Sequence, residues 1–322
     1  MADPTYTFTI FTSTRNRAHT LHRPFEALKA QTFRDFEWLV IDNGSTDGTT
    51  ELIERYAAEA DFPIRYYWQE DAGKQGSMNR AVKIARGTLF VTLDSDDGII
   101  PTALERLLAN WESIPAASRD RYTGVTALCL DEHGDLVGTR FPFDPTDSDS
   151  REIRYRYKVR GEKWGFQRTD VLREHLLPDI PGYRGLIPFS TIWSEIARSY
   201  KTRYVNEGLH VYWQDQEVRL SRPTAWSDDA LGSMIEAGSI VRNDVHFFRD
   251  DPIAFAIMAI KYSRSAFHSG VGIREQWVEM DNLPARALWA ATLPAGWLVH
   301  WLERLGFASF VHRIRMLFAC FA

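Results

Sequence analysis

Hydrophobic and polar positions follow two different periods along the first hundred residues. Short runs rich in β-branched and aromatic residues predict four strands, at residues 6–11, 36–41, 64–68 and 88–93. Between these runs apolar residues recur at spacings of three and four, as at Leu21, Phe25 and Leu28, which predicts three helices. Strands that alternate with helices are joined by right-handed crossovers. The pattern therefore predicts an α/β fold with a Rossmann-like, mostly parallel sheet flanked by helices.

The fourth apolar run ends abruptly at Asp94-Ser95-Asp96-Asp97-Gly98. Open α/β sheets bind their ligands at the carboxyl ends of their strands. In an extended chain, Asp94 and Asp96 project to the same side and Ser95 projects to the other. Two neighbouring carboxylates suit a divalent cation that retains waters and holds a diphosphate. The alternative is an acidic turn that closes a strand, because Asp and Gly are ordinary turn residues.

The pattern beyond this acidic segment predicts further elements of the same kind. They are a helix at residues 103–111, a pair of strands at 124–130 and 136–141, and a helix at 169–175. We expect the first domain to extend over residues 1–220, with a helical extension at residues 221–322.

The last third of the chain has a different pattern. Asp250-Asp251-Pro252 predicts the start of a helix. Residues 287–302 then carry no formally charged side chain. Three tryptophans lie in this run, Trp289, Trp297 and Trp301. The run is shorter than the ~20 residues of a spanning helix, and Pro294 and Gly296 interrupt it. Tryptophans flanked by arginines favour an interfacial, membrane-binding hairpin over a spanning helix. A homodimer contact is the alternative.

Composition narrows the classes of function. The chain has 322 residues and a net charge of -5, whereas nucleic-acid-binding proteins are usually basic, so we expect no nucleic-acid partner. Cys129 and Cys320 lie far apart and fit no metal or redox motif, which favours a reducing compartment. No basic region with an apolar core precedes the first strand, so we expect no signal peptide and a cytoplasmic location.

Four polar segments, each at the end of a predicted strand, carry a resemblance to a known family. They are Thr14-Arg15-Asn16, then Asp42-Asn43-Gly44-Ser45-Thr46-Asp47-Gly48, then Gly73-Lys74 with Met78-Asn79-Arg80-Ala81, and the acidic segment at residues 94–97. In this order they resemble the family 2 glycosyltransferases. That resemblance implies a GT-A fold and transfer of a sugar from a nucleotide-diphosphate donor. It is specific over residues 6–98 and continues more weakly to about residue 212.

The resemblance also implies roles for individual residues. The residues expected at the nucleotide are Thr14, Asn16, Asp42, Asn43, Lys74, Asn79, Asp94 and Ser95. Asp42 or Asn43 would accept a hydrogen bond from N3–H of uracil or thymine, although an Asn amide can also donate. Lys74 would approach the diphosphate, and Asn79 would shape the same wall. Asp96 would bind the metal ion, Mn²⁺ or Mg²⁺, together with Asp94.

Two further residues have alternative interpretations. The resemblance places Trp164 near the sugar and acceptor, where its ring would be a stacking platform, whereas core packing explains a tryptophan equally well. Asp97 is a further candidate metal ligand. Asn43 to Asp47 can serve simply as a helix cap, and Lys74 as a solvated surface lysine.

The general base is the point where the chain departs from the family. Transfer with inversion requires a base that takes the proton from the attacking hydroxyl. The family places an Asp or Glu just before the helix that contains Glu195, and this position falls at or near Phe189. Glu195 is the nearest carboxylate along the chain, more than one helical turn away. Asp97 and Asp215 are the alternatives.

These observations predict a metal-dependent, inverting glycosyltransferase. Its donor is a UDP- or dTDP-sugar, and its acceptor is a hydroxyl of a glycan or lipid-linked molecule, as in cell-surface polysaccharide synthesis. We expect it to be peripheral on the inner face of the cell membrane. One rival is a nucleotide-sugar-binding subunit that has lost catalysis, which an apolar residue at position 189 favours. The other is a nucleotidyltransferase, which usually has a glycine-rich basic loop after its first strand.

Overall fold

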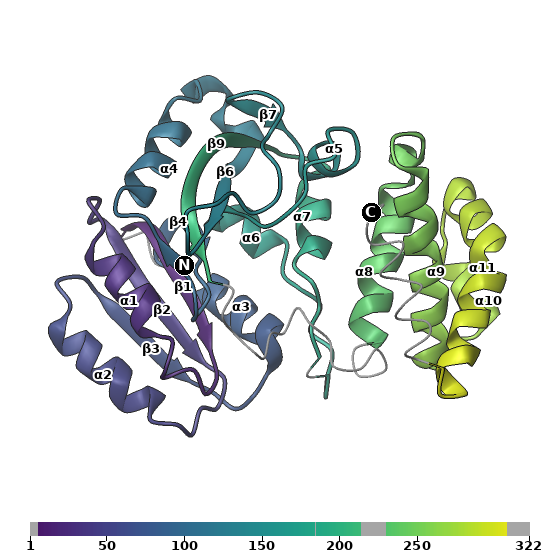
Figure 1. Cartoon of the computed structure of the whole chain (residues 1–322), viewed down its shortest axis with the longest axis horizontal. Coiled ribbons are helices and arrows are strands. Elements are labelled where there is room, and N and C mark those ends of the chain that lie inside the picture. Colours follow the sequence, from purple (N-terminus) through teal and green to yellow (C-terminus); the bar gives the residue numbers. More distant parts are fainter. Residues whose placement is uncertain (1–5, 184, 214–229, 308–322) are drawn as a thin grey trace. The chain divides into compact units, whose positions relative to one another are not determined.

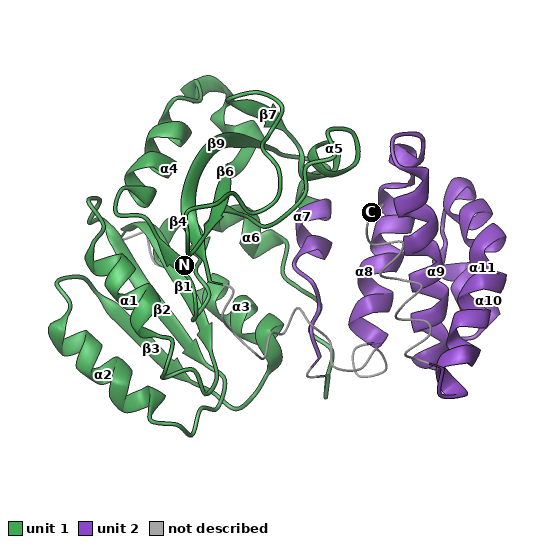
Figure 2. Ribbon diagram, viewed as in Figure 1, with its two compact units in different colours: residues 1–184, 196–217 green, residues 185–195, 218–322 purple. Residues whose placement is uncertain are grey.

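The computed structural model describes residues 6–183, 185–213 and 230–307. The chain divides into two compact units, one made of residues 1–184 and 196–217 and the other of residues 185–195 and 218–322 (Figure 2). The first unit is built on a sheet, and the described part of the second is helical.

The four strands predicted from the first hundred residues form the parallel part of the sheet (Figure 1). They are β1 (Tyr6–Thr14), β2 (Phe36–Asp42), β3 (Ile64–Trp68) and β4 (Gly87–Thr92). β1 pairs in parallel with β2 and β4, and β2 pairs in parallel with β3. In this register Thr14 lies beside Asp42, so the polar segments after these strands start at one edge of the sheet.

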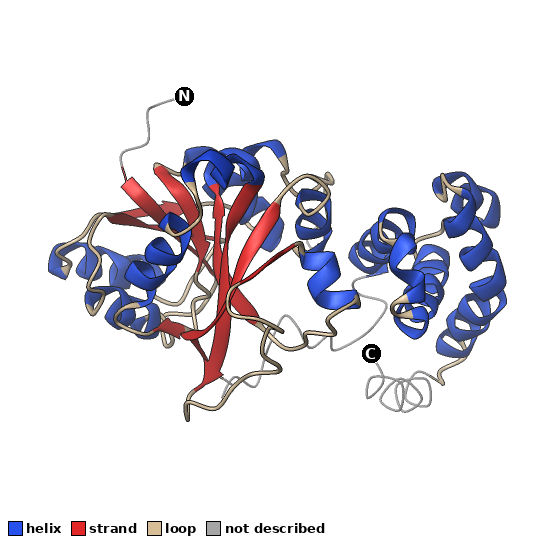
Figure 3. Cartoon of the chain, turned by 90° about the horizontal axis from the view of Figure 1, so that it is seen from above, coloured by secondary structure: helices blue, strands red, loops and turns tan. Residues whose placement is uncertain are grey.

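Helices cover both faces of the sheet, so β2 is buried along its whole length (Figure 3). One face packs against α1 (His22–Lys29), α2 (Thr49–Glu59) and α4 (Ala103–Glu112). The other face contacts α3 (Gly73–Ile84) and α6 (Thr169–Glu174). The predicted stripe of Leu21, Phe25 and Leu28 is fully buried in the first of these layers.

The rest of the sheet is mixed. β8 (Lys163–Arg168) pairs antiparallel with β4, followed by β6 (Tyr122–Asp131), β9 (Lys201–Tyr212) and β5 (Gly98–Ile99). The short strand β7 (Thr146–Ser148) pairs with β9, and η1 (Ala116–Arg121) and α5 (Ser150–Tyr155) lie in the connections. The predicted α/β class is confirmed, and its parallel part is the order β3-β2-β1-β4.

The predicted strand at residues 136–141 does not form. Only an isolated bridge joins Leu136 to Leu130. Gly138 adopts a φ of +83°, and a Cβ there would lie 2.1 Å from the carbonyl oxygen of Arg160. This left-handed conformation turns the backbone out of an extended path. Sequence periodicity does not register such a turn.

The second unit contains α7 (Ser190–Ile196) up to residue 195, α8 (Ala230–Asn243), η2 (Val245–Arg249), α9 (Pro252–His268), α10 (Ile273–Glu279) and α11 (Leu283–Arg304). The predicted start of α9 is confirmed, because Asp251 accepts a hydrogen bond from the backbone N–H of Ala254 at 3.2 Å. Ala237, Tyr262 and Trp289 contribute to one buried apolar cluster.

Residues 287–302 lie within the single continuous helix α11. The expectation that Pro294 and Gly296 interrupt this run is therefore wrong. A Cβ at Gly296 would lie 2.7 Å from the Ser263 side chain, so the glycine permits close packing of α11 on α9. The rest of the expected hairpin, from residue 308 onward, lies outside the described residues. Within the described ranges, no helix is both long and apolar enough to span a membrane.

Candidate functional site

The acidic segment after β4 forms a turn. The backbone N–H of Asp97 donates to the carbonyl oxygen of Asp94 at 3.2 Å, and Ser95 is buried in the turn. The backbone is therefore turned and not extended, but the expected alternation is present, because Asp94 and Asp96 are partly exposed and Ser95 is buried. Asp94 acts on Asp96 through its charge. Burial and this neighbouring charge together raise the pKa of Asp96. Negative charge is thus concentrated at the carboxyl end of β4.

Lys74 of α3 binds Asp94. Its Nζ donates to the two carboxylate oxygens at 2.8 and 3.1 Å. Burial alone would raise the pKa of Asp94, but the Lys74 ammonium outweighs this effect and holds that pKa below its usual value. The Asp94 side chain is still 42% exposed, so it remains accessible to a ligand. The structure therefore brings together two residues that the sequence predicts at the nucleotide.

Two arginines that were not predicted also reach the acidic turn. Arg17, in the loop after β1, lies 3.5 Å from a carboxylate oxygen of Asp96. Arg23 of α1 donates to the backbone carbonyl oxygen of Asp96 at 3.1 Å and lies over the Trp213 ring at 4.3 Å. Arg17 follows the predicted Thr14-Arg15-Asn16 segment directly, which is the only signal the sequence offers for it.

Asp97 is buried beneath the turn. Its carboxyl accepts a hydrogen bond from the backbone N–H of Trp213 at 3.1 Å and lies 3.5 Å from Nε2 of His210. Burial, reinforced by the charges of Asp94 and Asp96, raises the pKa of Asp97 to about 8. Burial lowers the pKa of His210 to about 4. Near neutral pH the contact therefore joins two uncharged groups. Catalysis by Asp97 stays a prediction.

Trp164 is part of the core beside this turn. Its indole N–H donates to the carbonyl oxygen of Thr92 at 2.7 Å, and its ring stacks on His210 with a centroid distance of 5.4 Å. The side chain is buried. Of the two interpretations of Trp164, core packing is the one that the structure supports.

The loops after β1 and β2 form a connected wall. Asn16 has a φ of +52° and donates from its backbone N–H to the Ser45 hydroxyl at 2.8 Å. Its side-chain oxygen accepts from the backbone N–H of Thr46 at 2.8 Å. Thr14 is buried at the base of this wall, and its hydroxyl has no hydrogen-bond partner among the described residues. Buried hydroxyls in native proteins normally have a hydrogen-bond partner, so Thr14 is an exception; its contact with the nucleotide stays a prediction.

Asp42 and Asn43 are buried at the end of β2. The carboxylate of Asp42 accepts from the Tyr66 hydroxyl at 2.7 Å and from the backbone N–H of Ser45 at 2.8 Å. The Asn43 amide donates to the carbonyl oxygen of Gly73 at 2.9 Å, which fixes the start of α3 against β2. The structure thus places this pair beside Lys74. Its contact with a base stays a prediction.

Asn79 connects α3 to the segment after α6. Its amide donates to the carbonyl oxygen of Leu177 at 2.8 Å, and its side-chain oxygen accepts from the backbone N–H of Leu177 at 3.0 Å. The side chain therefore holds α3 against residue 177, and its part in a wall at the diphosphate stays a prediction. A direct contact with the nucleotide stays a prediction.

Glu195 is exposed on α7, in the second unit. Phe189 lies just before this helix, with its ring centroid 6.4 Å from that of Trp193. Asp215, the other alternative base, lies outside the described residues. The identity of the base stays a prediction.

The residues at the turn fit a divalent cation. Asp94 and Asp96 supply hard oxygen donors, and burial, together with the charge of Asp94, raises the pKa of Asp96, so a bound cation would favour its ionised form. Over the described ranges, no group of three or more His, Cys, Asp or Glu side chains is arranged to hold a metal ion. Such a cation would therefore take its remaining ligands from water or from a diphosphate.

Comparison with known proteins identifies the class to which this fold and site belong. The family model for glycosyl transferase family 2 matches residues 9–187, more than half of the chain. The chain belongs to this family.

Two curated relatives show how far the similarity extends. An uncharacterised glycosyltransferase of Nostoc sp. is 31% identical over 104 residues, which cover 32% of each protein. The GalNAc(5)-diNAcBac-PP-undecaprenol beta-1,3-glucosyltransferase of Campylobacter jejuni is 22% identical over 249 residues, covering 75% of this chain and 76% of that protein. The first match thus spans about a third of its relative.

A similar solved structure is that of residues 1–349 of TarS from S. aureus, in complex with UDP-GlcNAc. It superposes with a TM-score of 0.59 at 15% identity, covering 93% of this chain and 92% of that one. This likeness confirms the GT-A fold.

Proposed function

We propose that the chain transfers a sugar from a UDP- or dTDP-sugar to a hydroxyl of a glycan or lipid-linked acceptor, with inversion and with Mn²⁺ or Mg²⁺ as cofactor. The observation that carries the proposal is the Lys74–Asp94 pair at the carboxyl end of β4, beside Asp96. At this edge of the sheet the Lys74 ammonium suits a diphosphate, and the carboxylates of Asp94 and Asp96 suit the metal ion bound to it.

The residues at the turn would share the chemistry. A divalent cation held by Asp94 and Asp96 supplies charge that stabilises the departing nucleoside diphosphate. Lys74 and Arg17 add positive charge on the same side, where negative charge develops on the leaving group. A general base, for which Glu195, Asp97 and Asp215 are the candidates, would take the proton from the acceptor hydroxyl as that oxygen attacks the anomeric carbon and the bond to the diphosphate breaks.

A lipid-linked acceptor and a peripheral position on the inner face of the cell membrane are part of the same proposal. The Campylobacter relative is named for an undecaprenol-linked substrate. In this chain, α11 exposes Trp297, Leu298 and Trp301, and Arg304 lies over the Trp301 ring at 5.4 Å. Exposed tryptophans and an adjacent arginine suit the headgroup region of a bilayer. A homodimer contact is the alternative use of this face.

Substitution of Asp96 tests the proposal. Asp96 lies in a turn at a strand end, so Asp96→Ala should leave the fold intact while it abolishes Mn²⁺-dependent UDP binding in calorimetry. Asp61→Ala, which removes a carboxylate of an exposed ion pair with Arg34, is the matched control. An unchanged UDP affinity of Asp96→Ala in Mn²⁺ would contradict the metal assignment.

Turnover of the donor, by hydrolysis or by transfer of its sugar, distinguishes an enzyme from a subunit that only binds nucleotide sugars. A subunit that only binds nucleotide sugars would bind UDP-sugars with Mn²⁺ but would release no UDP from them over hours. Steady release of UDP from a UDP-sugar, abolished by Asp96→Ala, is the result that we expect.

A further inference from the structure

The start of α3 is held by a residue outside the helix. Ala72, which precedes the helix, has no polar side chain to cap it. Instead Asn43, directly after β2, accepts a hydrogen bond from the backbone N–H of Ala72 at 3.4 Å and donates to the carbonyl oxygen of Gly73 at 2.9 Å. One carboxamide therefore contacts the two residues that come directly before Lys74.

The conformation of Gly73 makes these contacts important. Its φ is +71°, in the left-handed region that glycine adopts without strain and as readily as other backbone conformations. Hydrogen bonds hold it in this one: its N–H donates to a carboxylate oxygen of Asp71 at 3.0 Å, and its carbonyl oxygen accepts from Asn43. The direction in which the chain enters Lys74 therefore depends on Asn43.

Asn43 is itself fixed by its surroundings. It is only 5% exposed, and its side-chain oxygen also accepts from the amide of Gln69 at 2.8 Å. Gln69 follows β3, and its own side-chain oxygen accepts from Arg80 of α3 at 2.9 Å. A carboxamide donates and accepts, whereas an ionised aspartate at position 43 could not donate to Gly73. The arrangement therefore requires the amide.

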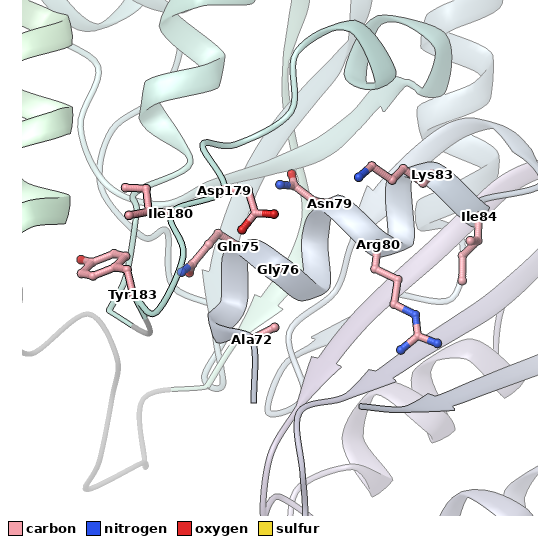
Figure 4. A pocket seen from close by; sticks show the side chains of 10 residues that line it. All are labelled: Ala72, Gln75, Gly76, Asn79, Arg80, Lys83, Ile84, Asp179, Ile180 and Tyr183. Atoms are coloured by element: carbon pink, nitrogen blue, oxygen red, sulfur yellow. The ribbon is translucent and has the colours of Figure 1, made fainter. Parts of the chain in front are cut away.

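A pocket of about 330 Å³ lies along the same helix, and Gln75 and Asn79 are among the side chains that line it (Figure 4). Neither Lys74 nor Asn43 belongs to this lining. Lys74 instead donates to Asp94, at the carboxyl end of β4. The pocket therefore does not account for the contacts of Asn43, which lead along the backbone to the ion pair of Lys74 with Asp94.

We infer that Asn43 is a positioning residue for Lys74, and that it acts on the diphosphate of the donor through the backbone of residues 72–73. This role rests on the proposed function, because Lys74 must contact that diphosphate. It requires no contact between Asn43 and the nucleotide base. With the start of α3 held in place, Nζ of Lys74 stays 2.8 Å from the Asp94 carboxylate and can meet a phosphate beside it.

Calorimetric titration of UDP in Mn²⁺ tests this role on Asn43→Ala, alone and combined with Lys74→Met. The alanine removes the contacts without adding a charge. UDP affinity should fall roughly three- to tenfold in the single variant, as expected for lost hydrogen bonds. In the Lys74→Met background the same substitution should change it by less than about twofold, because residues that act through one contact are not additive. Asn206→Ala is the matched control, since Asn206 likewise donates to and accepts from the backbone of Phe141.

A second route keeps the test independent of how well Asn43→Ala folds. Gln69→Met removes the donor that fixes the Asn43 oxygen, and Gln69 is not itself expected at the nucleotide. It should weaken UDP binding roughly two- to fivefold, again only when Lys74 is present. Uridine, which lacks the diphosphate, should bind the native chain and both variants alike in saturation-transfer difference NMR. Melting temperatures show whether each variant is folded.

The outcomes separate this role from the function on which it rests. A native chain that binds no UDP in Mn²⁺ would contradict the proposed function. UDP binding that neither Asn43→Ala nor Gln69→Met weakens would overturn the positioning role alone. An equal loss of UDP affinity with and without Lys74 would also overturn it, because Asn43 would then act independently of Lys74. A loss of uridine affinity as large as that of UDP would overturn it by assigning Asn43 to the base.

Discussion

Lys74 donates to both carboxylate oxygens of Asp94, at 2.8 and 3.1 Å, from an element that precedes β4 in the chain. The ion pair joins the first turn of α3 to the acidic turn. It holds Asp94 ionised, because the ammonium keeps the pKa of that carboxyl below its usual value against the effect of burial. A diphosphate with its cation can share this pair, the phosphate approaching Lys74 and the metal ion approaching Asp94.

The first prediction concerns Lys74→Met. The variant loses a charge-assisted hydrogen bond to the diphosphate, a contact of about 1.5–3 kcal/mol, so Mn²⁺-dependent UDP affinity should fall by roughly ten- to a hundredfold in calorimetry. Lys29→Met is the matched control, because Lys29 also pairs with a carboxylate, that of Glu59. If Lys74→Met binds UDP as the native chain does, Lys74 serves only to neutralise Asp94.

The second prediction concerns the pH dependence of stability. The pKa of Asp97 rises from 3.8 to about 8 on folding, so between these values the unfolded chain has lost a proton that the folded chain keeps. Stability therefore falls as pH rises through this window. The pKa of His210 falls from 6.5 to about 4, so His210 lowers stability as pH falls through its own window. The two effects oppose each other below pH 6.5, and only that of Asp97 remains between 6.5 and 8.

Asp97→Asn isolates this effect. The amide resembles the protonated carboxyl and can keep the contacts to Trp213 and His210. In buffer with EDTA, the native chain should lose stability between pH 6.5 and 8 in urea titrations, and Asp97→Asn should lose much less. Parallel pH profiles for the two proteins would show that the Asp97 carboxyl is ionised in the folded state.

Some parts of this site can be predicted from sequence and others cannot, for physical reasons. The parallel strands are short runs rich in β-branched and aromatic residues, and the helices between them carry apolar stripes at spacings of three and four, so local periodicity is sufficient for that half of the sheet. It also places the polar segments at one edge. The turn at residues 94–97 is one of the two local alternatives that the sequence offers, but the burial of Asp97 is not a local property, since it depends on contacts with His210 of β9 and with Trp213 after that strand.

The tryptophans of α11 illustrate the same limit. Trp289, Trp297 and Trp301 lie in one run without formal charges, so no charged neighbour in the run marks which of them is buried. In the structure Trp289 is 3% exposed and donates from its indole N–H to Gln276 at 3.1 Å, whereas Trp297 is 48% exposed. The packing of α11 on α9, permitted by Gly296, decides which tryptophans face outward.

The third prediction concerns the general base. If Glu195 takes the acceptor proton, Glu195→Gln should lower the rate of sugar transfer by ~10²–10⁴-fold. UDP affinity should change little, because the charge removed is exposed on α7. Glu174→Gln, at another exposed glutamate, is the control. A transfer rate within a few-fold of the native chain would assign the proton to another group, with Asp97 and Asp215 as the next candidates.

The fourth prediction is that the exposed face of α11 binds membranes. A chain ended near Asp281 would lose α11 and uncover the cluster that buries Trp289, so point substitutions are the sharper test. The double variant Trp297→Gln and Trp301→Gln should stay folded, since these side chains are 48% and 40% exposed, and should sediment less with anionic liposomes. Native binding should weaken at high salt, because a basic residue near an anionic surface contributes about 1 kcal/mol.

The matched control for this last experiment is the pair Ile273→Gln and Val278→Gln, which removes exposed apolar side chains from α10. If only the α11 variant loses liposome binding, that face of α11 is the contact. Equal loss in both variants would mean that general surface hydrophobicity drives the binding. A native chain that stays monomeric and does not sediment with liposomes at low salt would contradict the membrane proposal. A dimer that only the α11 variant dissociates would assign the same face to self-association.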